Sequence, residues 1–301
     1  MPLQVLVTGG SGFVGRSVVP ALLKAGHRVR VVDRDAYPDP AVPTVVGELR
    51  DPAVRAAAFA APTDAVVHLA AVTSVLRSVE DPVGTYETNV AVTAGLLELA
   101  RTTAARRFLL ASTNAVVGDV GTATITEDSP LRPLTPYGAT KAAGEMLLSG
   151  YLSQGLSTCA LRFSNVYGPG MAHKDSFVPR LMRAALAGGG VSVYGDGTQV
   201  RDLIHVADVA RGVLLALGSE VTGPVILGAG SSVRVLDIVE AARRATGREI
   251  PAEHVPPKPG EMPAVIVEPA RARALGWSPT VSLEDGLRGV WQEFRAAAQT
   301  A

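Results

Sequence analysis

A tyrosine and a lysine stand four residues apart in the segment Tyr137-Gly138-Ala139-Thr140-Lys141. On a helix this spacing places both side chains on one face. A free tyrosine has a pKa near 10, and lowering it to about 7 takes about 4 kcal/mol of preferential phenolate stabilisation. A lysine ammonium and a positively charged cofactor ring are two charges that can supply this energy. The pair predicts a tyrosine acid/base, although the same spacing also occurs between ordinary neighbours on a solvated helix face.

A hydroxyl group is expected close to this pair. The apolar segment Phe108–Ala111 runs directly into Ser112, Thr113 and Asn114. Ligands of open α/β sheets bind at the carboxyl ends of the strands. A hydroxyl at that position can hydrogen-bond a reacting oxygen and share its proton with Tyr137.

A glycine-rich segment, Thr8-Gly9-Gly10-Ser11-Gly12-Phe13-Val14-Gly15, follows the first apolar run of the chain. It satisfies G-x-G-x-x-G from Gly10 and G-x-x-G-x-x-G from Gly9. Glycine is needed in such a loop because backbone N–H groups must approach a pyrophosphate at the start of a helix. Glycine-rich turns also occur without a ligand, but the strand before and the helix after this one favour a dinucleotide site.

An acidic residue indicates which dinucleotide this is. Asp33 ends the second apolar run, eighteen residues beyond Gly15. A carboxylate at that point accepts hydrogen bonds from the ribose hydroxyls and repels a 2′-phosphate, which favours NAD over NADP. Arg34 is the opposing signal, since an arginine there could accept the phosphate. We expect NAD as the cofactor.

The elements that position these residues alternate in the first half of the chain. Five short buried strands are expected at Leu3–Val7, Arg28–Val32, Thr44–Val46, Ala65–Leu69 and Phe108–Ala111. Helices are expected at Arg16–Ala25, Thr88–Arg101 and Pro136–Ser153, the last with a proline at its entry. This alternation predicts an α/β fold with a doubly wound, parallel Rossmann sheet.

The pattern of residue types changes in the second half, where proline and glycine are frequent from about Gly168 onward. Helices are expected at Phe177–Leu186, Val235–Thr246 and Leu283–Ala298, separated by loops and short strands. We expect a dinucleotide-binding Rossmann domain over residues 1–167, completed by parts of residues 191–228. A smaller α/β substrate-binding domain is expected over residues 168–301.

Composition excludes several classes of protein. Hydrophobic residues make up 47% of the chain and charged residues 19%, which is typical of a buried sheet and not of disorder. Basic and acidic residues number 28 each, so no basic face for nucleic acid is expected. The single Cys159 cannot form an internal disulfide, and the histidines lack metal-ligand spacing. No apolar run approaches the ~20 residues of a membrane span, and the N-terminus lacks signal-peptide features, so we expect a cytoplasmic protein.

Together these motifs resemble the extended short-chain dehydrogenases/reductases, specifically the NAD-dependent nucleotide-sugar epimerase/dehydratase family of the UDP-glucose 4-epimerase type. The resemblance extends over nearly the whole chain. It rests on Thr8–Gly15, Asp33, His68–Ala71, Asn89, Ser112–Gly118, Tyr137–Lys141, Arg162–Gly170 and Tyr194–Asp202.

The resemblance implies roles for individual residues. Thr113 matches the catalytic Ser/Thr, Tyr137 the acid/base, and Lys141 the residue that lowers the tyrosine pKa and holds the nicotinamide ribose. The implied cofactor site consists of Gly9, Gly12, Phe13, Val14, Gly15, Asp33, Arg34, Glu48, Leu49, Leu69, Ala70, Ala71, Asn89, Ala111, Ser112, Tyr137, Lys141 and Phe163. The implied substrate site consists of Thr73, Thr113, Asn114, Tyr137, Asn165, Val178, Val193, Tyr194, Arg201, Lys258 and Glu261.

Departures from the family pattern reduce the number of reactions that the chain is expected to catalyse. Family members that are 4,6-dehydratases carry Asp and Glu after the catalytic threonine, where this chain has Asn114 and Ala115. The missing acids disfavour loss of water. Arg201 matches an arginine that clamps the substrate diphosphate, and Asn165 a residue that contacts it. Lys258 stands where many members have a second arginine, so it keeps the charge but loses the bidentate fork.

The sequence therefore predicts an NAD-dependent epimerase of a UDP-linked sugar, acting at C4 through a transient 4-keto intermediate. Two alternatives stay open: a dehydrogenase or reductase of a keto-sugar or other alcohol, and a non-catalytic NAD-binding regulator. The resemblance also implies a homodimer built on the helices Thr85–Arg101 and Pro136–Ser153. The apolar residues expected to form its interface are Leu96, Leu97, Met146 and Leu147.

Overall fold

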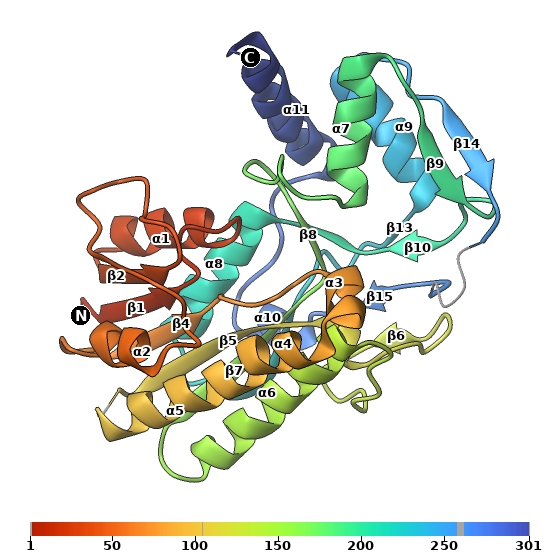
Figure 1. The fold of residues 1–301 in the computed structure, drawn as a ribbon. Coiled ribbons are helices and arrows are strands. Elements are labelled where there is room, and N and C mark those ends of the chain that lie inside the picture. The colour runs from red at the N-terminus through yellow and green to blue at the C-terminus, as the bar shows by residue number, and fades with distance from the viewer. Residues whose placement is uncertain (1, 104, 258–261, 301) are drawn as a thin grey trace.

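The computed structural model describes residues 2–103, 105–257 and 262–300. Its centre is a parallel sheet of seven strands in the order β12-β7-β5-β4-β1-β2-β3 (Figure 1). These strands are β1 Gln4–Thr8, β2 Arg28–Asp33, β3 Thr44–Val46, β4 Ala65–His68, β5 Arg107–Thr113, β7 Ser157–Phe163 and β12 Gly223–Leu227. The strand order reverses between β1 and β4, which is where ligands bind in such sheets. The predicted doubly wound Rossmann sheet is confirmed.

Helices cover both faces of this sheet. The first face carries α1 Gly15–Lys24 and α8 Val206–Leu217, and the second carries α2 Pro52–Ala58, α5 Val92–Thr102 and α6 Pro136–Leu152. Successive side chains of a strand point to opposite faces of the sheet. Val5 and Val7 therefore pack in the core on the first face, and Leu6 packs in the core on the second. Because both faces are covered, inner strands such as β1 and β4 are mostly apolar. Strand β2, next to the edge, instead alternates arginine and valine over its first four residues.

Helix α6, which carries the tyrosine and lysine, begins at a clear capping signal. Thr135 is its N-cap and accepts a hydrogen bond from the Gly138 N–H at 3.2 Å. Pro136 takes the first helical position, where a missing N–H costs nothing. The predicted helix Pro136–Ser153 is confirmed to within one residue.

The predicted regular helix Thr88–Arg101 is wrong in one respect. After α3 Val75–Glu80 and α4 Pro82–Tyr86, a π-helical turn spans Glu87–Ala91 before α5 begins. Asn89 lies in this turn and hydrogen-bonds the N–H and C=O of Val72 at 2.8 and 3.0 Å. It also donates to the Thr140 hydroxyl at 3.0 Å. Apolar periodicity carries no signal for such a turn, which is a frequent feature of functional sites.

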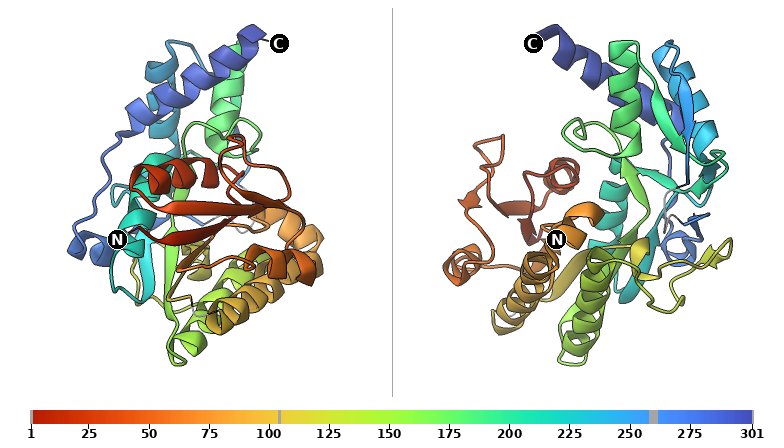
Figure 2. Two further views of the ribbon diagram at one scale, coloured as in Figure 1. Left: turned by 90° about the vertical axis from the view of Figure 1, so that its left-hand side faces the viewer. Right: turned by 45° about the vertical axis from the view of Figure 1, so that its right-hand side comes forward.

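The C-terminal half has a core of its own. It contains the helices α7 Phe177–Ala187, α9 Val235–Thr246 and α11 Leu283–Thr300 and the strands β9 Val191–Tyr194 and β14 Ala252–Val255. Leu181, Ile238 and Trp291 are buried in this core. These elements lie together to one side of the seven-stranded sheet (Figure 2). The three helices predicted for this half are present.

Short strand pairs connect the two halves. They are β8 Asn165–Tyr167 with β11 Leu203–His205, β10 Val200–Arg201 with β13 Val233–Arg234, and β6 Thr124–Ile125 with β15 Ile266–Val267. A short helix, α10 Ala270–Ala274, follows β15. Because β12 returns to the edge of the central sheet, the two halves are interleaved along the chain.

Two residues of the expected dimer surface are buried instead. Leu96 and Leu97 are fully buried on the side of α5 that faces the sheet, so the prediction that they offer exposed apolar surface is wrong. The helical period places both on the inner face, together with Ala100. Met146 on α6 is 69% exposed, and Leu147 is half-buried. Within the described ranges, no helix combines the length and apolarity needed to cross a membrane.

Candidate active site

The residues predicted to carry the chemistry meet at the carboxyl end of β5. Thr113, the last residue of that strand, is buried. Its side chain is hydrogen-bonded with that of Tyr137, which is half-buried in the first turn of α6. Thr113 Oγ1 also accepts from the Ala115 N–H at 3.2 Å, which fixes its rotamer. The fold therefore brings the two predicted reactive hydroxyls into direct contact.

Lys141 lies one turn further along α6 and is buried. Its Nζ donates to the Ala111 carbonyl of β5 at 2.8 Å. Because residues four apart share a helix face, Lys141 lies on the same side of α6 as Tyr137. The tyrosine, the lysine and the end of β5 thus form one cluster.

Burial changes the ionisation of both groups. It raises the pKa of Tyr137 to about 12, although the hydrogen bond with Thr113 opposes the rise. It lowers the pKa of Lys141 to about 8, against the opposing influence of the Glu145 charge. The chain by itself therefore holds a protonated phenol beside a largely charged lysine at neutral pH. A phenolate forms there only when further positive charge faces the tyrosine.

The glycine loop is packed too tightly for side chains at two of its positions. Gly9 has a φ of +71°, and a Cβ there would lie 2.6 Å from the Ala70 backbone nitrogen. A Cβ on Gly15 would lie 2.3 Å from the Gly9 carbonyl oxygen. Among the residues that the structure describes, no side chain caps the N-terminus of α1. The N–H groups of Arg16 and Ser17 donate to the carbonyls of Gly12 and Val14, at 3.0 Å each. The positive end of the helix dipole still faces the glycine loop, where a dinucleotide pyrophosphate would lie.

The Asp33 carboxylate is fixed at the edge of this loop. Its Oδ2 accepts from the Ser11 N–H at 2.9 Å and its Oδ1 from the Arg34 N–H at 2.7 Å. Asp33 is half-buried, whereas Arg34 is exposed. Each carboxylate oxygen keeps a lone pair for a further donor, so the geometry fits a ribose diol.

A buried hydrogen-bond chain stiffens the ends of β1 and β4. The Ala70 N–H donates to Thr8 Oγ1, which lies 2.6 Å from His68 Nδ1. His68 Nε2 lies 3.0 Å from Thr93 Oγ1, which donates to the Asn89 carbonyl. Since that bond uses the only Thr93 hydroxyl proton, His68 must donate from Nε2 and accept at Nδ1. Burial lowers the pKa of His68 to about 3, so the ring is neutral.

The other predicted cofactor residues border these loops at two levels of exposure. The buried ones are Phe13, Leu49, Asn89, Ser112 and Phe163. The half-buried ones are Val14, Glu48, Leu69, Ala70, Ala71 and Ala111. Except for Asn89, which reaches the Val72 backbone from the π-helical turn, they lie at or just beyond the carboxyl ends of β1, β3, β4, β5 and β7.

The predicted diphosphate residues are held together by Asp202. Asn165 is exposed, and its backbone N–H and side-chain Nδ2 both donate to the Asp202 carbonyl, at 3.1 and 2.8 Å. The half-buried Arg201 immediately precedes Asp202. The Asp202 carboxylate is buried and accepts the N–H groups of Ala229 and Gly230 at 2.8 Å each. This anchoring places Asn165 and Arg201 on neighbouring segments.

The remaining predicted substrate residues differ in access. Thr73 and Tyr194 are exposed, while Asn114 is buried next to Thr113. Val178 and Val193 are inside the core of the C-terminal half, so their side chains stabilise that half. The sequence offered no means of separating core valines from ligand contacts, because both types of site are apolar.

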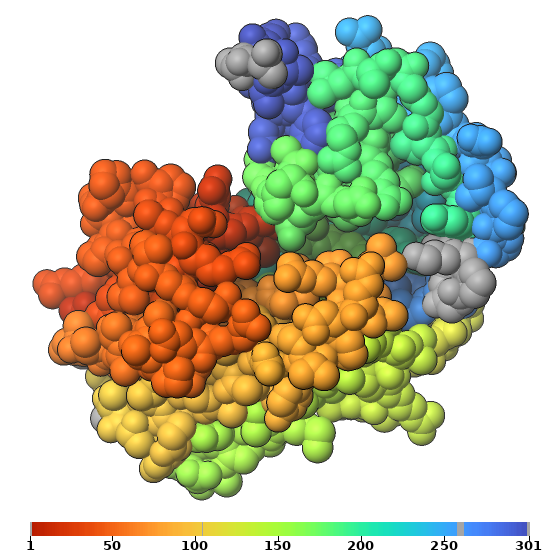
Figure 3. Space-filling view, viewed as in Figure 1, coloured from red at the N-terminus to blue at the C-terminus, as the bar shows by residue number. Residues whose placement is uncertain are grey.

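Lys258 and Glu261, the last two predicted substrate residues, lie outside the described residues. In the part of the chain that the structure describes, no cluster of three His, Cys, Asp or Glu residues could hold a metal. The surface is hollowed between the N-terminal segments, drawn in red and orange, and the green loop that precedes α7 (Figure 3).

A buried ion pair beside the site was missed at the level of sequence. The side chains of Glu145 on α6 and Arg162 on β7 are 7% and 3% exposed, with Nη2 and Oε2 2.8 Å apart. Ser112 Oγ donates to Glu145 Oε1 at 2.5 Å. The spacing of Tyr137, Lys141 and Glu145, four residues at each step, is the signal that could have found it.

Comparison with known proteins finds a matching family and similar chains. Residues 5–228 match the profile of the NAD dependent epimerase/dehydratase family. A UDP-glucose 4-epimerase of Streptomyces lividans is 35% identical, with 92% of each chain covered. A dTDP-glucose 4,6-dehydratase of Streptomyces griseus is also 35% identical, over 95% of this chain and 92% of the relative. Identity alone therefore does not separate the two reactions.

The fold and the cofactor are shared with a solved structure. The UDP-glucose 4-epimerase of Thermus thermophilus, in complex with NAD, superposes with a TM-score of 0.91 and 36% identity, over 98% of this chain and all of that one. The glycine loop and Asp33 fit the same dinucleotide. The cofactor of this chain is NAD, and the chain belongs to the NAD dependent epimerase/dehydratase family.

Proposed function

We propose that this chain is an epimerase of a nucleotide-diphosphate sugar, UDP-linked, that inverts C4 through a transient 4-keto intermediate. One observation carries the proposal: Thr113, Tyr137 and Lys141 form a complete acid/base cluster, while the two positions after Thr113 hold no carboxylic acid. The cluster is suited to moving a proton from a sugar hydroxyl. The missing acids leave no partner for the elimination of water.

Within this proposal each residue of the cluster has one task. Tyr137 accepts the proton of the C4 hydroxyl and later returns it. Thr113 hydrogen-bonds the same sugar oxygen and Tyr137, which keeps the reacting oxygen in line. The buried Lys141 ammonium favours the phenolate over the phenol. NAD, when bound, would supply the hydride acceptor and donor for C4.

The substrate diphosphate is assigned to the C-terminal half. Arg201 offers a guanidinium, whose fork suits a diphosphate oxygen pair. Asn165, held beside it through Asp202, adds an amide donor. With the nucleotide end fixed, the keto-sugar can rotate in the site and present its opposite face to the cofactor. Holding the reactants in this orientation lowers the activation free energy by about 7–11 kcal/mol in favourable cases.

The same proposal assigns cofactor binding to one domain and substrate binding to the other. Residues 1–167, together with α8 and β12, bind the cofactor, because β12 is a strand of the central sheet and α8 packs against its first face. The rest of residues 168–301 binds the nucleotide and closes over the sugar.

The proposal is tested by supplying UDP-glucose, UDP-glucuronate or their N-acetyl relatives to the purified protein without added cofactor. We expect NMR to detect the C4 epimer of at least one of them, with no accumulation of NADH absorbance. Arg201→Ala should raise the KM for that substrate. Arg234→Ala, which removes an exposed arginine paired with Asp237, is the matched control. Stoichiometric NADH release with a non-nucleotide alcohol, together with an unchanged KM in Arg201→Ala, would instead identify a dehydrogenase.

A further inference from the structure

Three consecutive residues at the end of β5 are each bonded to a different residue of α6. Ala111 accepts a hydrogen bond from Lys141 Nζ at 2.8 Å. Ser112 donates to Glu145 at 2.5 Å, and Thr113 is hydrogen-bonded with Tyr137. The three α6 residues are spaced by four, so they lie on one face of the helix. The catalytic pair and Glu145 therefore share one polar contact surface with the strand.

Glu145 is held from its other side by Arg162. The guanidinium Nε lies 3.0 Å from Oε1 and Nη2 lies 2.8 Å from Oε2, which is a bidentate arrangement. Arg162 Nη1 also donates to the Glu127 carbonyl at 3.1 Å. These contacts leave the Glu145 carboxylate little freedom to move.

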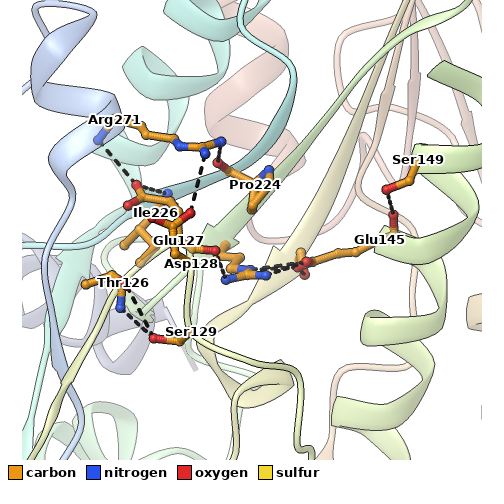
Figure 4. A network of polar contacts seen from close by, with 11 residues as sticks. Thr126, Glu127, Asp128, Ser129, Glu145, Ser149, Pro224, Ile226 and Arg271 are labelled. Carbon is orange, nitrogen blue, oxygen red and sulfur yellow. Dashed lines mark hydrogen bonds and ion pairs between the residues drawn. The ribbon is translucent and has the colours of Figure 1, made fainter. Parts of the chain in front are cut away.

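The polar network continues to the edge of the sheet. The Glu127 carboxylate accepts the N–H groups of Ile226 on β12 and Arg271 on α10, at 3.1 and 3.4 Å. Figure 4 shows Glu127 between these two segments, with Glu145 projecting from its helix toward the same network. Arg162 is thus oriented from outside the catalytic helix, by a segment that carries none of the catalytic residues.

A buried ion pair is weak evidence for a role in stability. Desolvation of the two charges can exceed their attraction, and apolar replacement of such a pair is often neutral or stabilising. The pair Glu145 and Arg162 is nevertheless buried directly against Ser112, next to the proposed catalytic threonine. This location calls for a role in the site.

We infer that Glu145 is a positioning residue: held by Arg162, it fixes the end of β5 through Ser112 and supplies the negative charge that keeps the Lys141 ammonium in place for Tyr137. This inference rests on the proposed function, because it assumes that Lys141 assists Tyr137. It adds a carboxylate and its arginine partner to the groups that control the reaction.

The charged and titratable surroundings support this assignment. Lys141 shares one helix face with Tyr137 and Glu145, and its charge interacts with Glu145 and with the neutral His68 of β4. Glu145 faces Arg162 from β7 and also Cys159, whose thiol pKa burial raises to about 11. Burial lowers the pKa of Lys141, and the Glu145 charge is what opposes this change.

The test measures the Lys141 pKa directly, without any substrate. The sequence contains four lysines, so NMR of protein labelled at the lysine ε-carbons gives few signals, and Lys141→Met assigns the relevant one. We expect Glu145→Gln in the NAD-bound protein to lower the Lys141 pKa by about one unit or more. Glu145→Asp, which keeps the charge, should retain most of the wild-type value. An unchanged pKa in Glu145→Gln would overturn the inference.

Two further variants keep the result interpretable. If Glu145→Gln leaves Arg162 unpaired and does not fold, Glu145→Gln with Arg162→Gln removes both charges, and the Lys141 pKa should still fall. Asp208→Asn removes a buried carboxylate of α8 that binds Thr280 and Val281, away from the site. It should lower the Tm and leave the Lys141 pKa unchanged.

Turnover separates this inference from the proposed function. Where an epimerase activity is present, the alkaline limb of its pH profile should move to lower pH in Glu145→Gln by the same amount as the Lys141 pKa. If Tyr137→Phe kept full activity, the proposed function would fail. If Tyr137→Phe were inactive and the alkaline limb of the Glu145→Gln pH profile did not shift, only the positioning role of Glu145 would fail.

Discussion

His68 Nδ1 lies 2.6 Å from the Thr8 hydroxyl, and this buried contact joins the carboxyl ends of β1 and β4 at the point where the strand order reverses. A neutral ring is required there, because Nδ1 accepts and Nε2 donates. The loops that leave these two strands carry Gly9 and Ala70, which approach each other closely. A change in the His68 charge should therefore disturb the cofactor loops as well as the core.

The first prediction concerns stability at low pH. The folded-state pKa of His68 is about 3, below its ordinary value of 6.5. Above pH 6.5 both folded and unfolded chains hold a neutral ring, so its contribution to stability is complete. Below pH 6.5 the unfolded state binds the proton first, and each unit toward pH 3 costs about 1.4 kcal/mol. Urea unfolding should show wild type losing about 1 kcal/mol more than His68→Gln between pH 6.5 and 5.5, because the unfolded ring is already half protonated at pH 6.5. Equal losses would contradict the neutral buried ring.

The second prediction concerns cofactor choice. Because the Asp33 carboxylate is fixed by Ser11 and repels a 2′-phosphate, the wild-type protein should bind NAD more tightly than NADP. Asp33→Ser should reduce this preference by about tenfold, or ~1.4 kcal/mol. Asp35→Asn, at an exposed position nearby, should leave it unchanged. Titration calorimetry gives both affinities. Tighter binding of NADP by the wild type would show that Arg34 decides the choice.

The third prediction separates chemistry from binding. Tyr137→Phe removes only the phenolic oxygen, so it should lower turnover by about 10²–10⁴-fold with nearly unchanged affinity for NAD. Lys141→Met should lower turnover and weaken NAD binding. Tyr151→Phe is the matched control, because this tyrosine of the same helix bonds Glu98 at the surface. Near-normal turnover in Tyr137→Phe would mean that another group is the base.

The fourth prediction is a homodimer built on α4 and α6. Val83 and Tyr86 of α4 and Met146 of α6 are exposed apolar side chains, and these two helices are in contact. Apolar surface of this kind is typical of subunit interfaces. Light scattering should give a dimer at micromolar concentration, and Val83→Glu with Met146→Glu should give a monomer. Leu23→Glu on α1 should have no effect. A monomeric wild type would contradict this interface.

Much of the fold could be predicted because the sheet is buried on both faces. Such strands are mostly apolar, and Asp33 and Thr113 were expected at their ends because polar residues follow there. The helix α6 was expected over Pro136–Ser153, with the proline at its entry. The π turn at Asn89 was not, since the hydrogen bonds between its side chain and the Val72 backbone join separate segments and no local pattern records them.

The site was predicted where a motif joins neighbouring residues and missed where contacts link distant ones. Tyr137 and Lys141 share a motif, whereas Glu145 and Arg162 meet only through the packing of α6 on β7. Leu96 and Leu97 were placed on the wrong face because an apolar residue in a helix fits a core and an interface equally well.

The central claim is that the hydride removed from C4 returns to the same carbon. The most direct measurement supplies UDP-glucose deuterated at C4 and follows the products by NMR and by NADH absorbance. The account predicts a C4 epimer that keeps the deuterium at C4, with no accumulation of reduced cofactor and no loss of the 6-hydroxyl. A product with hydrogen at C4, stoichiometric reduced cofactor, or a 4-keto-6-deoxy sugar would contradict it.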